Sequence, residues 1–330
     1  MFPSLAHLAS LTDDVGTIQH AFGTLPNRAT GYCTDDLART LIVALQHQAL
    51  EPANADAERI AHTALSFLLH AQLPDGRFHN FMSYGREWLD DVGTEDSCGR
   101  AIWALGFAIA HAPHGDWRER SAVAFERALP TIAGFTHLRP LAYSAIGLAA
   151  EGTRSAVARA VLARLRAAFA ANAGGDWPWY ESSMTYDNAR MPQAQLLLAE
   201  FLDDSLAREE ALAALDFYRV QNLEGEFFSP VGNRGWLRRG AQKARFDQQP
   251  LEAAAAVDAF LTAHRAGLRS ARAEAERALQ WFYGRNVLGI ALIDERGGCA
   301  DGLGADGPNA NRGAESTLAF LMAAQSWELS

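Results

Sequence analysis

The chain reads as a series of helix-forming segments whose connections alternate between very short and long. Apolar residues recur with a helical period of about 3.6 in segments at 12–22, 35–50, 54–72, 97–112, 116–132, 138–151, 153–172, 188–202, 205–221, 247–266, 269–286 and 313–328. The short connections are 51–53, 113–115, 151–152, 203–204 and 267–268. The longer ones are 23–34, 73–96, 173–187, 222–246 and 288–312. Because a short connection makes neighbouring helices antiparallel, we expect helix hairpins with all long loops at one end.

The segments that follow the longer loops are the more apolar, as in 101–112, whereas their partners carry more charge, as in 118–127. Six apolar inner helices within six amphipathic outer helices describe an all-α (α/α)6 toroid. Segment 12–22 is expected to pair with 313–328 and close the ring. An open solenoid would show a repeat of fixed length, which the sequence lacks. We therefore expect one toroid domain over residues 1–330, with minor loop strands at 78–82, 226–230 and 287–293.

Composition excludes several classes of protein. The net charge of −10 argues against a nucleic-acid partner, because phosphate binding needs a basic surface. The sequence contains no apolar run long enough for a membrane span, and its first residues lack the basic and apolar parts of a signal peptide. Cys33, Cys98 and Cys299 are odd in number and far apart, as is typical of reduced thiols. We expect a cytoplasmic protein with no membrane partner.

Acidic residues gather where the long loops enter the predicted inner helices, at Asp35, Asp36, Glu95, Asp96, Glu181, Asp187, Asp247 and Glu315. Helix capping explains any one of them equally well, because N-caps and first turns favour carboxylates. In a toroid, however, these helix starts converge on one cavity, and glycoside hydrolysis requires two carboxyl groups that flank the bond. Mutual repulsion in the pairs Asp35–Asp36 and Glu95–Asp96, or apolar burial of Glu181, is a way to raise the pKa of a general acid.

Aromatic and amide side chains interleave the same loops and suggest a saccharide site, since flat rings stack on sugars and polar side chains bind hydroxyls. The candidate substrate-binding residues are Tyr32, Asp35, His79, Asn80, Trp88, Arg100, Trp177, Trp179, Glu181, Asn188, Asp247, Gln248 and Glu315. Tryptophan more often serves packing, which is the preferred interpretation of Trp103 and Trp281 within helices. A lone histidine such as His79 more often has a structural hydrogen bond than a catalytic role.

Motifs for other chemistry are absent or weak. Residues 302–307 match G-x-G-x-x-G, but no helix follows at once and no βαβ unit surrounds them, which predicts a flexible loop. The sequence has no Walker A, G-x-S-x-G, H-E-x-x-H or C-x-x-C motif. We therefore expect neither a cofactor nor a metal.

Seven segments together resemble the six-hairpin glycosidase-like proteins of bacteria: HLASLTDDVGTIQHA, GYCTDDLAR, DGRFHNFM, GTEDSCGRAIWALG, TYDNARMPQA, FDQQPLEA and NRGAESTLAF. The resemblance runs from about His7 to the C-terminus. It implies an (α/α)6 toroid whose function is connected with carbohydrates. In that group a similar domain is often attached to a sugar-nucleotide glycosyltransferase, which implies a separately encoded glycosyltransferase as a partner. No part of this chain has the pattern of a Rossmann-type domain that binds a nucleotide sugar, so transferase activity itself is not expected.

The leading hypothesis is a glycoside hydrolase that cleaves an oligosaccharide, with inversion favoured. Its candidate catalytic carboxylates are Asp36, Glu95, Asp96 and Asp187, while Asp247 and Glu315 would bind hydroxyls or position water. A second hypothesis is a sugar epimerase or isomerase in which His79 and another base move a proton. A third is a non-catalytic carbohydrate-binding partner of the glycosyltransferase.

Overall fold

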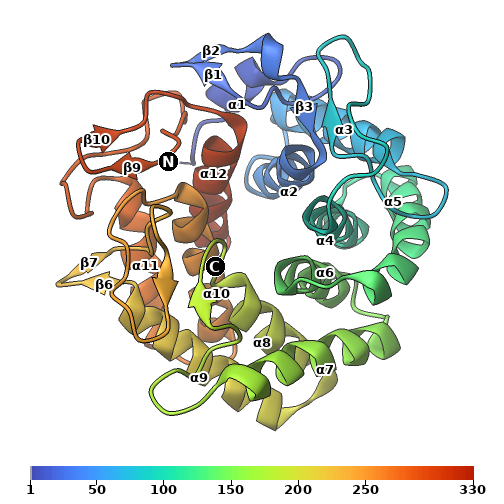
Figure 1. The fold of residues 1–330 in the computed structure, drawn as a ribbon. Coiled ribbons are helices and arrows are strands. Elements are labelled where there is room, and N and C mark those ends of the chain that lie inside the picture. Colours follow the sequence, from blue (N-terminus) through green and yellow to red (C-terminus); the bar gives the residue numbers. More distant parts are fainter. Residues whose placement is uncertain (1) are drawn as a thin grey trace.

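The computed structural model describes residues 2–330, and its twelve α-helices form two concentric rings (Figure 1). The inner ring consists of α2 (Thr34–Leu50), α4 (Glu95–His111), α6 (Leu138–Glu151), α8 (Arg190–Leu202), α10 (Pro250–Arg265) and α12 (Ala314–Glu328). The outer ring consists of α1 (Ala6–Leu11), α3 (Ala55–Ala71), α5 (Gly115–Ala128), α7 (Ser155–Asn172), α9 (Ser205–Gln221) and α11 (Ala271–Phe282). Two 3-10 helices, η1 (Arg28–Thr30) and η2 (Leu129–Gly134), lie between them in the chain.

The inner helices pack against one another in chain order, and α12 packs against α2 to close the ring. Each outer helix contacts a neighbouring inner helix, as α3 contacts α2 and α11 contacts α10. The predicted (α/α)6 toroid is thereby confirmed. Within residues 2–330, no helix is both long and apolar enough to cross a membrane.

The expected helix at 12–22 is wrong. Helix α1, which contacts α12 at the closure of the ring, ends at Leu11, and the following residues form isolated bridges and strand β1 (Ala21–Phe22). The carboxylate of Asp13 accepts hydrogen bonds from the backbone N–H groups of Val15 and Gly16 and so closes a turn where a helix would have to continue. β-Branched residues after that turn favour the extended pairing.

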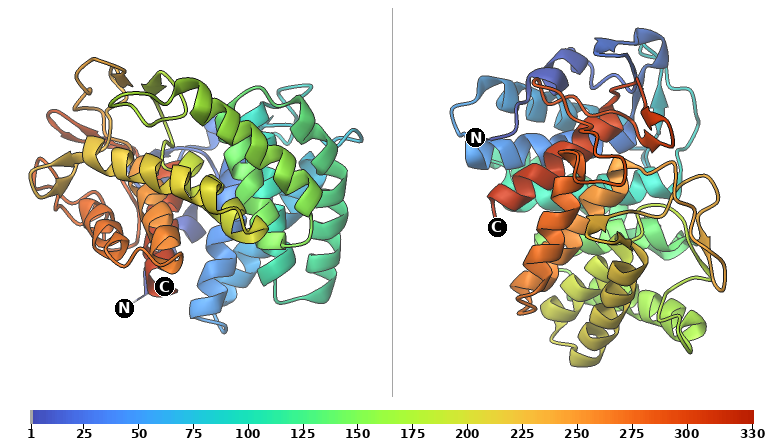
Figure 2. Two further views of the ribbon diagram at one scale, coloured as in Figure 1. Left: turned by 90° about the horizontal axis from the view of Figure 1, so that it is seen from below. Right: turned by 90° about the vertical axis from the view of Figure 1, so that its left-hand side faces the viewer.

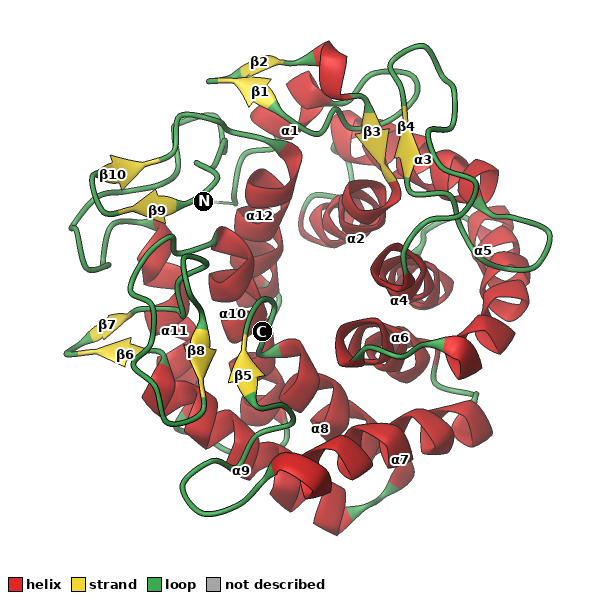
Figure 3. Ribbon diagram, viewed as in Figure 1, coloured by secondary structure: helices red, strands yellow, loops and turns green. Residues whose placement is uncertain are grey.

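The long loops carry five two-stranded antiparallel sheets in the described part of the chain, all at the same end of the barrel (Figures 2 and 3). The pairs are β1 with β2 (Leu25–Pro26), β3 (Tyr32–Cys33) with β4 (Phe81–Met82), β5 (Ser183–Met184) with β8 (Leu237–Arg238), β6 (Leu223–Glu224) with β7 (Phe227–Phe228), and β9 (Leu303–Gly304) with β10 (Gly307–Pro308).

Two of the three expected strand segments, 78–82 and 226–230, contain β4 and β7. The third, 287–293, contains only a single bridge, from Ile293 to Cys299. The segment 302–307, expected as a flexible loop, contributes to the β9–β10 hairpin. These corrections concern the loops and leave the helical rings unchanged.

Small residues let the inner helices approach closely. A Cβ atom at Gly106 of α4 would overlap the carbonyl oxygen of Gly147 of α6, and one at Gly147 would lie 2.6 Å from the carbonyl oxygen of Ile102. Inner helix α10 is buried at every position from Pro250 to Ala263, many of them alanine. Helices α4 and α6 are therefore packed at backbone contact distance.

Candidate functional site

The N-termini of inner helices converge on a cleft at the loop end of the barrel, which we call the front cleft. Its first lobe has a volume of about 230 Å³ and is lined by Asp35, Arg39, Asp96, Arg100, Thr185, Tyr186, Val231, Asn233, Gln249, Leu251, Glu252 and Glu315. Its second lobe, of about 270 Å³, shares Asp35, Gln249 and Glu315 with the first and adds Gln19, His20, Cys33, Asp36, Phe81, Asp301 and Ser316. Among residues 2–330, no three potential ligand side chains are grouped so that they could hold a metal ion.

Four buried arginines, one from each of α2, α4, α6 and α8, form the base of this region: Arg39, Arg100, Arg139 and Arg190. Burial of a charge is costly unless a partner balances it. Their nearest carboxylate partners are Asp36 at 3.0 Å, Asp187 at 3.1 Å, Glu181 at 2.7 Å and Asp258 at 2.7 Å, respectively. The centre of the barrel is therefore an ion-pair layer that fixes the geometry of the cleft above it.

Glu252, in the first turn of α10, is a buried carboxyl group that lines the first lobe. Its Oε2 accepts a hydrogen bond from Asn188 Nδ2 at 3.1 Å, whereas its Oε1 has no hydrogen-bond partner among the described residues. Burial, followed by repulsion from Asp187, raises the pKa of Glu252 to about 7, although the Asn188 hydrogen bonds lower it in part. Glu252 is thus a carboxylic acid that keeps its proton near neutral pH.

The sequence prediction missed Glu252, because it started this helix at 247 and selected Asp247. A signal was available: proline is favoured at the first position of a helix, and Pro250 does begin α10. A start at Pro250 places Glu252, not Asp247, in the first turn. In the structure Asp247 lies before the helix and pairs with Arg234 at 2.9 Å.

Asp35 and Asp36 both lie in the cleft, and the pKa of each is raised. Burial is the main cause for both; it raises the pKa of Asp36 to about 7 despite the opposing charge of Arg39. The expected repulsion between these neighbours is only a minor contribution for Asp36. Asp36 also accepts a hydrogen bond from Cys33 Sγ at 3.2 Å. The second lobe is therefore distinctly acidic.

Two further acids, Asp96 and Glu315, line the cleft. Asp96 of α4 lines the first lobe and accepts a hydrogen bond from the Tyr186 hydroxyl at 2.7 Å. Glu315 of α12 lines both lobes and pairs with Arg39 at 3.2 Å while about half of its side chain remains exposed. Because α4 and α10 are separated by two inner helices on each side, Asp96 and Glu252 approach the first lobe from opposite walls.

The other two predicted catalytic acids lie outside the cleft. Glu95 accepts hydrogen bonds from the backbone N–H groups of Thr136 and His137 at the start of α6. Partial burial raises the pKa of Glu95, but these hydrogen bonds outweigh burial and lower it. Asp187 lies fully buried beneath the cleft, where its Oδ2 accepts from the Tyr143 hydroxyl at 2.6 Å and pairs with Arg100. Burial raises the pKa of Asp187, but Arg100 and Arg190 more than offset this and lower it.

Of the predicted binding residues, three line the cleft and two support it. Asp35, Arg100 and Glu315 contribute to its walls. Asn188 binds Glu252, and Glu181 holds both of its oxygens against Arg139 Nη1 at 2.7 and 2.9 Å. Asn188 thus holds Glu252 directly, whereas Glu181 acts through Arg139, which donates to the Tyr186 carbonyl and to Thr185 Oγ1 in the cleft wall.

The remaining predicted binding residues face elsewhere. Trp177 and Trp179 are buried against the outer helix α9, and Trp88 stacks on His79, whose Nδ1 is hydrogen-bonded to the Asp90 carbonyl at 2.8 Å. Two polar members of this group are likewise engaged outside the cleft, namely Tyr32 with Asp13 and Gln248 with Trp281. Asn80 is the exception: its backbone binds Asp90, but its buried side chain supports Asp35 of the cleft and lowers the pKa of that carboxyl in part. The aromatic loops thus fold back onto the outer ring and fill the core there.

No protein-family model matches the chain, and no curated protein matches it. Solved structures with nearly the same extent do match. A cellobiose 2-epimerase from Bacillus thermoamylovorans aligns with a TM-score of 0.72 at 11% identity, covering 97% of this chain and 96% of that one. A D-mannose isomerase aligns with a TM-score of 0.74 at 12% identity, covering 98% and 95%.

A GH76 α-mannanase from Bacteroides thetaiotaomicron aligns with a TM-score of 0.67 at 10% identity, covering 97% of this chain and 93% of that one. All three likenesses span almost the whole of both chains at low identity. The chain therefore has the (α/α)6 fold that is shared by these carbohydrate-active enzymes.

Proposed function

We propose that the protein is a carbohydrate-active enzyme that hydrolyses a glycosidic bond of an oligosaccharide in the front cleft. The observation that carries this proposal is the pairing of environments in the first lobe. Glu252 is a buried carboxyl with a raised pKa, whereas Asp96 is partly exposed and hydrogen-bonded to Tyr186. Glycoside hydrolysis uses a pair of carboxyl groups that flank the bond, one of which is a general acid with a raised pKa, as Glu252 has.

In this proposal Glu252 is the general acid that protonates the leaving oxygen, and Asp96 is the base that activates water. Their placement on opposite walls favours a single-displacement, inverting reaction, because inversion needs room for water between the sugar and the base. Asp35, Arg39, Arg100 and Glu315 bind hydroxyl groups, and the exposed Tyr186 ring offers a face on which a sugar can stack.

The other predicted catalytic acids receive different roles. Asp36 lines the second lobe, where it binds the adjoining sugar residue. Glu95 and Asp187 are positioning residues, because Glu95 holds the start of α6 and Asp187 holds Arg100 and Tyr143.

The three cysteines are buried and free, which supports the cytoplasmic location expected from the sequence.

The proposal is tested by assaying Glu252→Gln and Asp96→Asn on a panel of mannosides, glucosides and uronides. Loss of a general acid or base lowers kcat by about 10²- to 10⁴-fold. Glu276→Gln, at an exposed position of the outer helix α11, is the control for the change of charge and should retain kcat. Full activity in both cleft variants would overturn the assignment.

A sugar epimerase or isomerase is the second candidate, and the likeness to a cellobiose 2-epimerase and a D-mannose isomerase supports it. His79, the base expected for it, is held by Asp90 and Trp88 outside the cleft. His20 in the second lobe would have to replace it. Such an enzyme would introduce solvent deuterium into a sugar without releasing a reducing end.

The third possibility, a non-catalytic partner of a glycosyltransferase, would bind saccharide in the same cleft without turnover. It also requires physical association with the transferase. Co-purification of the two proteins, together with unchanged saccharide after prolonged incubation, would favour it over both enzymatic functions.

A further inference from the structure

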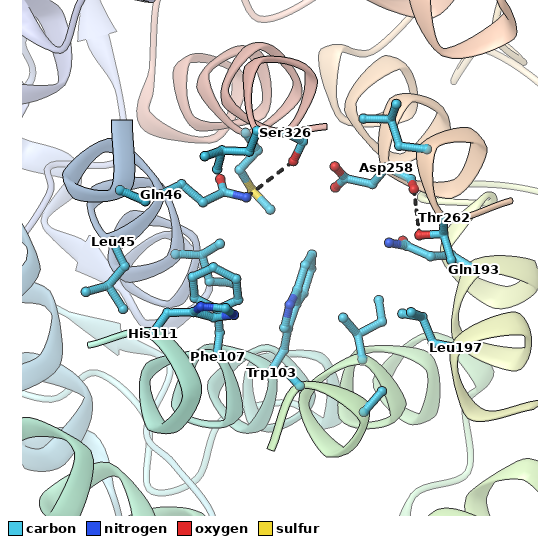
Figure 4. A pocket seen from close by; sticks show the side chains of 18 of the residues that line it. Leu45, Gln46, Trp103, Phe107, His111, Gln193, Leu197, Asp258, Thr262 and Ser326 are labelled. Carbon is cyan, nitrogen blue, oxygen red and sulfur yellow. Dashed lines mark hydrogen bonds between the residues drawn. The ribbon is translucent and has the colours of Figure 1, made fainter. Parts of the chain in front are cut away.

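A second and larger cavity opens at the opposite end of the barrel, and we call it the back cavity (Figure 4). Its volume is about 680 Å³. In the described part of the chain it shares no lining residue with either lobe of the front cleft. The same inner helices supply both: α4 gives Asp96 and Arg100 to the front, and Trp103 and Phe107 to the back.

Two polar side chains in this cavity are more than nine-tenths buried, and in each of them only one of the two polar atoms has a hydrogen-bond partner. Asp258 and Gln193 expose 8% and 5% of their surface. Arg190 Nη1 donates to Asp258 Oδ2 at 2.7 Å and to Gln193 Oε1 at 2.8 Å. Among residues 2–330, neither Asp258 Oδ1 nor Gln193 Nε2 takes part in a hydrogen bond. Figure 4 shows the Asp258 carboxylate and the Gln193 amide directed toward the open centre.

The walls around these groups are largely apolar. Trp103 stands in the middle of the cavity (Figure 4), with the Arg190 guanidinium 4.7 Å from its ring centroid. Apolar side chains from all six inner helices surround it, among them Ile42, Phe107, Ile146, Leu197, Leu261 and Met322. A cavity of a few hundred Å³ with apolar walls and a few convergent polar groups is typical of a small-molecule site.

We propose that the back cavity binds a small, uncharged amphipathic molecule with a hydroxyl-bearing head and an apolar body. Hydroxyl groups can donate to Asp258 Oδ1 and accept from Gln193 Nε2, which are the two unused positions. An ionic head is disfavoured beside Asp258, because Arg190 already balances the charge of Asp258 and a second buried charge there would lack a partner. The other arginine of the lining, Arg265, is exposed to solvent and therefore favours a buried anion less. The apolar body lies along the wall toward the mouth and removes that surface from water.

Hexane-1,2-diol is the probe, and its binding is followed by saturation-transfer NMR titration. The wild-type protein should bind it saturably. Propane-1,2-diol lacks the apolar body and hexanoate carries a charged head, so each should bind more weakly by about tenfold or more. Absence of saturable diol binding, or equal binding of hexanoate, would overturn the proposal.

Variants locate the binding. Ala149→Phe and Ala150→Phe place a ring at two half-buried positions of the cavity lining and should each weaken diol binding by about tenfold or more. Ala170→Phe, at an exposed position of α7, controls for the added ring. Glu252→Gln in the front cleft should leave diol binding unchanged. Binding that survives both cavity variants, or that Glu252→Gln abolishes, would contradict a site in the back cavity.

Discussion

Asn188 Nδ2 donates a hydrogen bond to Glu252 Oε2 at 3.1 Å and thereby holds the buried carboxyl, while Glu252 Oε1 has no hydrogen-bond partner among the described residues. A donor to a carboxylate stabilises its charged form and lowers its pKa. Burial acts in the opposite direction on Glu252 and is the stronger effect. Asn188 therefore positions the acid and tunes its proton affinity at the same time.

Removal of this donor should shift the pH dependence of the reaction. A general acid works while it is protonated, so activity should fall as pH rises through the Glu252 pKa of about 7. Asn188→Ala removes a contribution that lowers this pKa, and the alkaline limb of the kcat/KM profile should move to higher pH. Thr153→Ala at the exposed start of the α6–α7 connection is the control and should leave the profile in place. An alkaline limb unmoved by Asn188→Ala would contradict the tuning role.

Glu252 should also make stability depend on pH. Its pKa rises from 4.5 to about 7 on folding, so the folded protein retains a proton that the unfolded chain has lost. This contribution to stability is present below pH 4.5 and is lost as pH rises toward 7, by on the order of 3 kcal/mol at most. Glu252→Gln should therefore gain stability relative to wild type between pH 4.5 and pH 8 in urea unfolding. A constant difference between the two proteins would show that Glu252 is ionised in the fold.

The buried ion pairs should differ sharply from surface pairs in their effect on stability. Asp187→Ala leaves Arg100 and Arg190 without their shared carboxylate, and loss of a buried partner costs about 3–5 kcal/mol. Asp14→Ala removes an exposed partner of Arg86 and should cost about 0–1 kcal/mol. Equal free energies of unfolding for the two variants would argue that the central layer is solvated.

Because α4 packs closely against α6, a glycine-to-alanine substitution at their contact should lower the stability of the protein instead of raising it. Alanine is normally favoured over glycine within a helix by about 1 kcal/mol. Gly106→Ala should nevertheless destabilise the protein, because the added methyl group overlaps the Gly147 carbonyl. Gly115→Ala, at an open position in the first turn of α5, should be neutral or stabilising. Thermal unfolding of both variants measures the contrast, and a stabilised Gly106→Ala would mean that the two helices can separate at little cost.

The helical rings follow from the sequence because hydrophobic period and connection length are local properties. The direction in which a side chain points is not a local property, because it depends on how its helix is rotated within the ring. Glu95 and Asp96 are neighbours on one helix, and successive helical residues point about 100° apart, so only Asp96 faces the cleft. The sequence cannot distinguish them until the rotation of α4 within the ring is known.

The loop aromatics show a second limit. Trp177 and Trp179 lie beside an acid in the sequence, which suggested a sugar platform. Their rings pack on Phe217 and Tyr218 of α9 instead. Whether a long loop folds over the cavity or back onto the outer ring depends on distant partners that local patterns do not reveal. Glu252 was missed for the simpler reason that a helix start was placed three residues early.

The most direct test of the proposed reaction is proton NMR of the wild-type protein with oligosaccharides in D2O. We expect release of a new reducing end whose first anomeric signal has the inverted configuration, with no deuterium in carbon-bound positions and with loss of the reaction in Glu252→Gln. Deuterium exchange into an intact sugar, without any new reducing end, would contradict hydrolysis and establish epimerase or isomerase chemistry in its place.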